Sequence, residues 1–121
     1  MNSAVKQATI CMFYTNWCPH SRRIMPLWQS LQFQYEGKII NNYKLRFMEY
    51  NFTDPKWKPE FPSEAWISHS PIVDMWMKQY NVMGFPTVRI CRDNREIEYD
   101  SHAPLTLVTL KQFIRQELQN K

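Results

Sequence analysis

The chain has 121 residues, which is room for one domain of ordinary size and excludes a second hydrophobic core. Hydrophobic residues make up 44% and charged residues 21%, which excludes a disordered chain, and no apolar stretch approaches the roughly 18 residues that a membrane span needs. The net charge is +4, but the basic residues form no continuous run, which disfavours a nucleic-acid partner. We therefore expect a single domain over residues 1–121 that binds neither nucleic acid nor membrane.

The chain begins with two predicted elements, a strand and a helix. The N-terminal sequence MNSAVKQATI lacks the apolar core of a signal peptide and favours a cytoplasmic protein. Residues 8–15 are an apolar run rich in strand formers and predict a buried strand. Apolar residues then recur at helical spacing from Ile24 to Tyr35, which predicts an amphipathic helix that begins near Pro19 and ends before Gly37.

The middle of the chain is less regular. Residues 44–52 alternate between apolar and polar and predict a second strand. Residues 53–78 form an insertion rich in proline and tryptophan, with a short helix at 72–80 for which Ser70 is the expected N-cap. The aromatic side chains of this insertion and its histidine either pack on the core or form a surface for a partner, and we favour packing. They are Trp57, Phe61, Trp66, His69 and Trp76.

The last part of the chain predicts a hairpin and a closing helix. Residues 87–92 and 95–99 are two strands joined at Asp93-Asn94, residue types that tolerate positive φ. Residues 107–118 have helical periodicity, with Thr106 as the expected N-cap. The predicted order is therefore β-α-β-(α)-β-β-α.

The segment Trp17-Cys18-Pro19-His20-Ser21 lies where the first strand passes into the first helix. A thiol at a helix N-terminus meets free backbone N–H groups and the positive end of the helix dipole, both of which favour the thiolate. Arg22 and Arg23 add positive charge one turn further on. Cys18 is thus either a reactive nucleophile or a helix-capping residue with no chemical task.

A second segment, Tyr80-Asn81-Val82-Met83-Gly84-Phe85-Pro86-Thr87, ends directly before a predicted strand. A proline in such a turn is a candidate for a cis peptide bond, because X–Pro is the only common place for one. Taken alone, this segment predicts only a turn.

Together the two segments resemble the thioredoxin-like superfamily, the fold of thioredoxins and glutaredoxins. Trp17-Cys18-x-x-Ser21 is similar to the Trp-Cys-x-x-Cys motif with the second cysteine replaced, and Pro26 matches the family's helix proline. Tyr80-x-Val82-x-Gly84-Phe85-Pro86-Thr87 is similar to the cis-proline segment. The resemblance implies a central, mixed, four-stranded sheet flanked by helices, with an insertion before the cis-proline turn.

The resemblance also implies roles for site residues. Cys18 would attack a disulfide, and His20 would stabilise the thiolate, as in strongly oxidising periplasmic relatives that share the Pro-His dipeptide. Trp17, Pro19, Phe85 and Pro86 would line the substrate site, with Pro86 facing Cys18. Phe85 would offer its backbone groups to an extended peptide.

Three departures from the family pattern change the expected mechanism. Ser21 stands where the resolving cysteine would be, so no intramolecular disulfide forms at the motif. The family's buried Asp falls at Met12 and its partner Lys at Glu49, so the proton relay is absent as well. A monothiol mechanism has no resolving cysteine to deprotonate and needs no such base.

These observations leave three functional interpretations. The first is a monothiol thiol–disulfide oxidoreductase or isomerase acting on protein or glutathione mixed disulfides, with glutathione as a possible co-substrate and no bound cofactor or metal. The second is a redox-inactive binding module. The third is a trapping variant of a Cys-Pro-His-Cys dithiol enzyme in which Ser21 replaces the second cysteine.

The other two cysteines fall within predicted strands. The resemblance makes these strands antiparallel neighbours and places Cys11 and Cys91 about opposite each other. We expect both to be reduced core residues that do not resolve Cys18.

Overall fold

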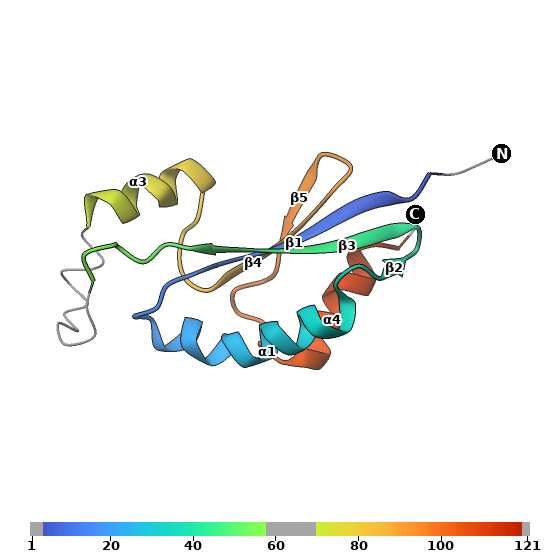
Figure 1. Ribbon diagram of the computed structural model, residues 1–121, viewed down its shortest axis with the longest axis horizontal. Coiled ribbons are helices and arrows are strands. Elements are labelled where there is room, and N and C mark those ends of the chain that lie inside the picture. Colours follow the sequence, from blue (N-terminus) through green and yellow to red (C-terminus); the bar gives the residue numbers. More distant parts are fainter. Residues whose placement is uncertain (1–3, 58–69, 120–121) are drawn as a thin grey trace.

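The computed structural model describes residues 4–57 and 70–119. Within these ranges the chain forms one five-stranded sheet and three helices (Figure 1). In chain order they are β1 (Lys6–Tyr14), α1 (Pro19–Tyr35), β2 (Ile39–Ile40), β3 (Tyr43–Asn51), α3 (Pro71–Tyr80), β4 (Thr87–Arg92), β5 (Arg95–Glu98) and α4 (Leu107–Glu117). No described helix is long and apolar enough to cross a membrane.

The sheet has the strand order β2-β3-β1-β4-β5, with β1 in the centre. β1 runs parallel to β3 and antiparallel to β4, so the sheet is mixed, as predicted. The predicted number of four strands is wrong, because the two-residue strand β2 pairs antiparallel with the start of β3. A strand this short shows no alternation in sequence. It is turned back by Asn41 and Asn42, which both have positive φ.

The alternation of side chains along β1 divides the protein into two apolar clusters. Ala8, Ile10 and Met12 are fully buried and point toward α1 and α4, which cover that face of the sheet (Figure 1). Cys11 and Phe13 point to the opposite face, where α3 packs near one end of the sheet. No helix of residues 4–57 or 70–119 covers the larger part of that second face, where the hollow described below lies.

In the C-terminal half the predicted turn at Asp93-Asn94 and the predicted cap at Thr106 are present, and the predicted cap at Ser70 is not. Asp93 and Asn94, which join β4 to β5, both have positive φ. Thr106 caps α4 through a capping box with Thr109. Ser70 occupies the N-cap position of α3, but its hydroxyl donates to the buried carboxylate of Asp54 and forms no hydrogen bond to the helix. The Asp54–Ser70 contact thereby joins the two described ends of the insertion.

One tryptophan of the insertion packs as we favoured. Trp76 lies 5.8 Å from Phe52, measured between ring centroids, and belongs to the second apolar cluster. Trp57 is half-buried. Phe61, Trp66 and His69 lie outside the described residues.

Candidate active site

Cys18 lies at the junction of β1 and α1, as the motif predicts. Its carbonyl accepts the first helical hydrogen bond, from the N–H of Arg22 at 3.0 Å, and Pro19 begins the helix. The side chain is 8% exposed and forms no capping hydrogen bond to the helix. Instead the thiol donates to the carbonyl oxygen of Phe85, with 3.9 Å between Sγ and that oxygen. The sulfur therefore faces the proline turn and not the helix backbone.

Two buried hydroxyl groups hold the turn that carries Cys18. The Thr15 hydroxyl accepts from the N–H of Cys18 at 3.3 Å, and the Ser21 hydroxyl accepts from the N–H of Thr15 at 3.3 Å. Sequence reasoning missed Thr15. Threonine three residues before the N-cap of a helix is typical of a side chain that bonds to a nearby backbone N–H, and this signal could have found it.

The proline turn is the other wall of the site. The Phe85–Pro86 peptide bond is cis. The Thr87 hydroxyl donates to the carbonyl of Gly84 at 2.7 Å, which closes the turn at the start of β4. The ring of Trp17 lies edge-on to Phe85 with 6.3 Å between centroids. Three of the predicted site residues, Trp17, Cys18 and Phe85, thus come together in space.

A groove of about 400 Å³ runs along this turn. Its walls include His20, Phe85 and Pro86 on one side, and Tyr99 and Asp100 beyond the end of β5 on the other. Pro19 is exposed at the first turn of α1. Phe85, which the Cys18 thiol contacts, lines this groove, whereas Cys18 itself is not among the described residues that line it.

His20 contacts Arg23. The guanidinium of Arg23 lies 3.3 Å from Nδ1 of His20, and because arginine can only donate, Nδ1 is the acceptor. Arg23 also reaches back to the carbonyl of Pro19. No hydrogen bond joins His20 to Cys18 in the described part of the chain, and the expectation that His20 stabilises the thiolate stays a prediction.

Met12 and Glu49, which stand where the resemblance places the Asp and Lys of the family's proton relay, lie side by side in the sheet. Met12 on β1 and Glu49 on β3 are register partners, and Met12 is fully buried. The carboxylate of Glu49 accepts from Nε1 of Trp28 at 3.1 Å. Burial, together with the charge of Glu49, raises the pKa of Tyr14. The buried position below the motif therefore holds a thioether in place of an acid.

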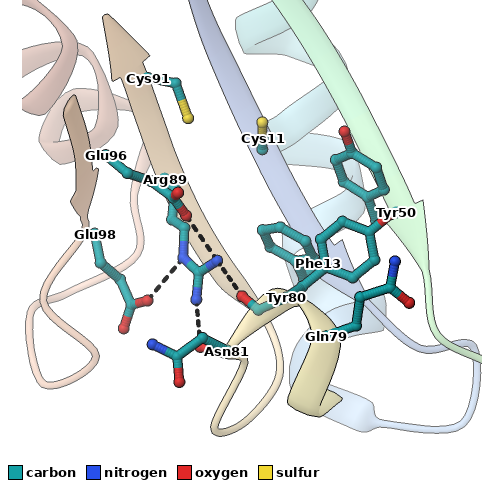
Figure 2. A pocket seen from close by; sticks show the side chains of 10 residues that line it. All are labelled: Cys11, Phe13, Tyr50, Gln79, Tyr80, Asn81, Arg89, Cys91, Glu96 and Glu98. Atoms are coloured by element: carbon teal, nitrogen blue, oxygen red, sulfur yellow. Dashed lines mark hydrogen bonds and ion pairs between the residues drawn. The ribbon is translucent and has the colours of Figure 1, made fainter. Parts of the chain in front are cut away.

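The other two cysteines lie on the far face of the sheet, in a hollow of about 610 Å³ (Figure 2). The predicted register is wrong by two residues: Cys11 is paired with Arg89 and Cys91 with Thr9, so the two thiols are diagonal neighbours. Both are free, and burial raises the pKa of Cys11 to about 12 and also raises that of Cys91. Cys11 is a core residue, whereas Cys91 is only partly buried.

Metal binding has no geometric basis in the described residues. Residues 4–57 and 70–119 contain no group of three or more His, Cys, Asp or Glu side chains that could hold an ion. The chemistry available at the site is that of one thiol at a helix N-terminus.

No family model matches the sequence, and no curated protein matches it. Solved structures do. The J-Trx1 fragment of ERdj5 matches with a TM-score of 0.64 and 17% identity over 97% of this chain and 47% of that one. The first two thioredoxin domains of Saccharomyces cerevisiae Eps1p match with a TM-score of 0.62 and 23% identity, over 95% of this chain and 36% of that one. The first thioredoxin domain of mouse protein disulfide-isomerase A4 matches with a TM-score of 0.60 and 16% identity, over 94% of this chain and 65% of that one.

The chain spans less than two thirds of the length of each of these three proteins. At these identities the likeness concerns the fold. The chain has a thioredoxin-like fold, which confirms the fold class that the motifs implied.

Proposed function

We propose that this protein is a monothiol thiol–disulfide oxidoreductase in which Cys18 attacks protein disulfides or glutathione mixed disulfides. One observation supports this most: the Cys18 sulfur lies at a helix N-terminus, 3.9 Å from the carbonyl oxygen of the residue before Pro86. The Cys18 thiol thereby contacts Phe85, a residue that lines the groove in which an extended substrate would lie.

The contact with Phe85 has a chemical consequence. In the thiol form, Sγ–H donates to the Phe85 carbonyl. A carbonyl oxygen has two lone pairs. The oxygen that contacts the Cys18 thiol can therefore also accept an N–H from an extended peptide.

The proposed reaction is a series of thiol–disulfide exchanges. The Cys18 thiolate attacks one sulfur of a disulfide, forms the S–S bond of a mixed disulfide and releases the other sulfur as a thiolate. With Ser21 in the resolving position, a first glutathione thiolate then attacks the Cys18 sulfur of the mixed disulfide and releases the substrate sulfur as a thiolate. A second glutathione thiolate attacks the glutathione sulfur of the resulting Cys18–glutathione disulfide, which releases the Cys18 thiolate and forms oxidised glutathione. The electrons that reduce the substrate come from glutathione. When a second thiol of the substrate attacks instead, the net result is isomerisation.

The substrate side of the proposal rests on backbone recognition. An extended peptide in the groove would pair with the backbone of Phe85, while Trp17, Pro19 and Pro86 supply apolar contact. The mouse protein disulfide-isomerase A4, which shares this fold, is named for chemistry of the same class.

A glutathione-coupled assay of disulfide reduction tests the proposal. We expect the protein to reduce a glutathionylated peptide, Cys18→Ser to abolish this activity, and the matched control Cys91→Ser to retain it. Equal activity of the wild type and Cys18→Ser would refute the proposed function. With dithiothreitol as the reductant in place of glutathione, Ser21→Cys should add reduction of insulin, because it supplies a resolving thiol next to Cys18.

A redox-inactive binding module is the second candidate, and the burial of Cys18 favours it. A thiol that is 8% exposed is less accessible than a free nucleophile, and Ser21 provides no resolving group. This candidate predicts that Cys18→Ser leaves peptide binding unchanged while the wild type shows no exchange. Measuring exchange and peptide binding on the same two proteins separates the candidates.

A further inference from the structure

Arg89 is a buried charge outside the Cys18 site. It lies in the middle of β4, on the face of the sheet opposite α1 and α4, and is 5% exposed. A buried guanidinium is costly unless its donors are all occupied by good acceptors. Its partners therefore show what this position requires.

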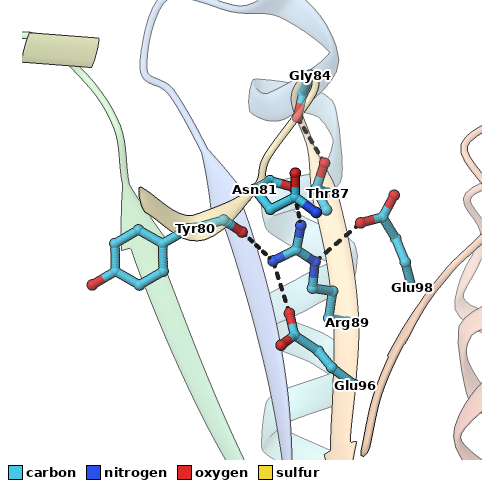
Figure 3. A network of polar contacts seen from close by, with 7 residues as sticks. All are labelled: Tyr80, Asn81, Gly84, Thr87, Arg89, Glu96 and Glu98. Carbon is cyan, nitrogen blue, oxygen red and sulfur yellow. Dashed lines mark hydrogen bonds and ion pairs between the residues drawn. The ribbon is translucent and has the colours of Figure 1, made fainter. Parts of the chain in front are cut away.

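The guanidinium bridges two separate elements (Figure 3). On one side it donates to the carboxylates of Glu96 and Glu98 on β5, at 2.8 Å and 3.0 Å. On the other side it donates to the backbone carbonyls of Tyr80 and Asn81, at 2.6 Å and 2.5 Å. The planar fork of arginine can serve all four acceptors at once, and the single ammonium of lysine cannot.

The two carbonyls mark the end of α3 and the start of the segment 82–86. Carbonyls at a helix C-terminus lack helical partners, and a cation there also meets the negative end of the helix dipole. Asn81, with φ 54°, turns the chain out of the helix toward Phe85. At the other end, Thr87 fixes Gly84. Side chains of β4 thus hold the chain at two points that precede Phe85, the residue that faces Cys18.

The apolar surroundings tie Arg89 to the same segment. The guanidinium carbon lies 4.9 Å from the centroid of the Phe13 ring, a cation–π contact. Phe13 stacks on Tyr50 and packs edge-on against Phe52. Phe52 in turn packs edge-on against Phe85, at 5.7 Å between centroids. The ring of Phe85 and the backbone leading to it are therefore both anchored from the Arg89 side of the sheet.

We propose that Arg89 is a positioning residue that fixes the 82–86 segment so that the backbone of Phe85 can bind an extended peptide beside Cys18. This inference rests on the proposed function. Arg89 lines neither the Cys18 contact nor the groove, so its effect reaches the reaction through the segment and through its partner Glu98, which lines the groove. It should matter for substrates that use the backbone of Phe85 and be unimportant for those that do not.

The test compares two substrates on Arg89→Lys, which keeps the charge but loses the fork. For a glutathionylated peptide we expect kcat/KM to fall about tenfold or more, because misplacement of binding groups by about 1 Å costs up to two orders of magnitude. For 2-hydroxyethyl disulfide, which has no peptide backbone, we expect a change within about twofold. The loss should lie mainly in KM. The matched control Glu96→Gln, which leaves both carbonyl contacts in place, should behave as wild type.

An equal loss on both substrates would indicate a general structural role and overturn the inference, as would no loss on either. Hydrogen exchange of the amides of 82–85 separates this failure from failure of the proposed function. If the wild type reduces neither substrate, the proposed function fails. Faster exchange confined to this segment in Arg89→Lys would still support the fixing of the segment, and unchanged exchange would refute it.

Discussion

Thr15 gives a sharp test of how the Cys18 turn is held. Its side chain is 1% exposed, and its hydroxyl accepts the N–H of Cys18 at 3.3 Å. Thr15→Val keeps the shape of the side chain and removes the acceptor, so the main cost is a buried N–H without a partner. Such a group costs about 1–3 kcal/mol. Because 3.3 Å is at the long end for this bond, we expect about 1–2 kcal/mol.

Hydrogen exchange of the Cys18 amide measures this contact directly. A loss of about 1–2 kcal/mol corresponds to exchange roughly 5–30 times faster at that amide in Thr15→Val. Urea unfolding should show a midpoint lower by about 0.5–1 M. Thr15→Ser is the matched control, because it loses a methyl group but keeps the hydroxyl. Its Cys18 amide should exchange as in the wild type. An amide that stays equally protected in Thr15→Val would refute the reasoning.

Two further predictions concern stability. Burial raises the pKa of the Cys11 thiol from 9.0 to about 12. Between these pH values the unfolded chain loses this proton and the folded chain keeps it, so the free energy of unfolding falls as pH rises from 9.0 to about 12. Cys11→Ala should flatten this decline in urea unfolding measured at several pH values, and parallel pH curves for the two proteins would contradict it. Asn94, with φ 60°, is in a conformation that glycine adopts freely, so Asn94→Gly should raise stability by up to about 1 kcal/mol. Asn94→Val should lower the thermal midpoint, and a stabilising valine would rule out this explanation.

Local sequence signals predicted the elements whose determinants lie within a few residues. The hairpin at Asp93-Asn94 and the capped helix after Thr106 depend on neighbours along the chain, and both are present. Strand β2 was missed because two residues have no periodicity, although the Asn41-Asn42 pair beside it is itself a turn signal. Ser70 shows the opposite case. A residue typical of an N-cap is instead hydrogen-bonded to Asp54, far along the chain.

In the candidate site, too, the sequence predicted some features and missed others. The motif residues Cys18 and Phe85 come together as the thioredoxin resemblance implied. The partner of His20 and the bridge made by Arg89 depend on side-chain directions that no spacing rule contains. The error of two residues in the register of Cys11 has the same origin, because the pairing of β1 with β4 is set by packing across the sheet.

The surroundings of Ser21 bear on whether this serine belongs to a dithiol enzyme with one residue exchanged. A single exchange would leave the rest of a dithiol site intact, including a buried acid under the motif. Here that position is Met12, fully buried among apolar side chains, and Glu49 beside it is hydrogen-bonded to Trp28. The Ser21 hydroxyl also accepts the N–H of Thr15, and a thiol would accept this bond only weakly. The three positions thus agree with each other in a protein without a resolving thiol. This argues against a trapping variant and fits the monothiol enzyme and the binding module equally.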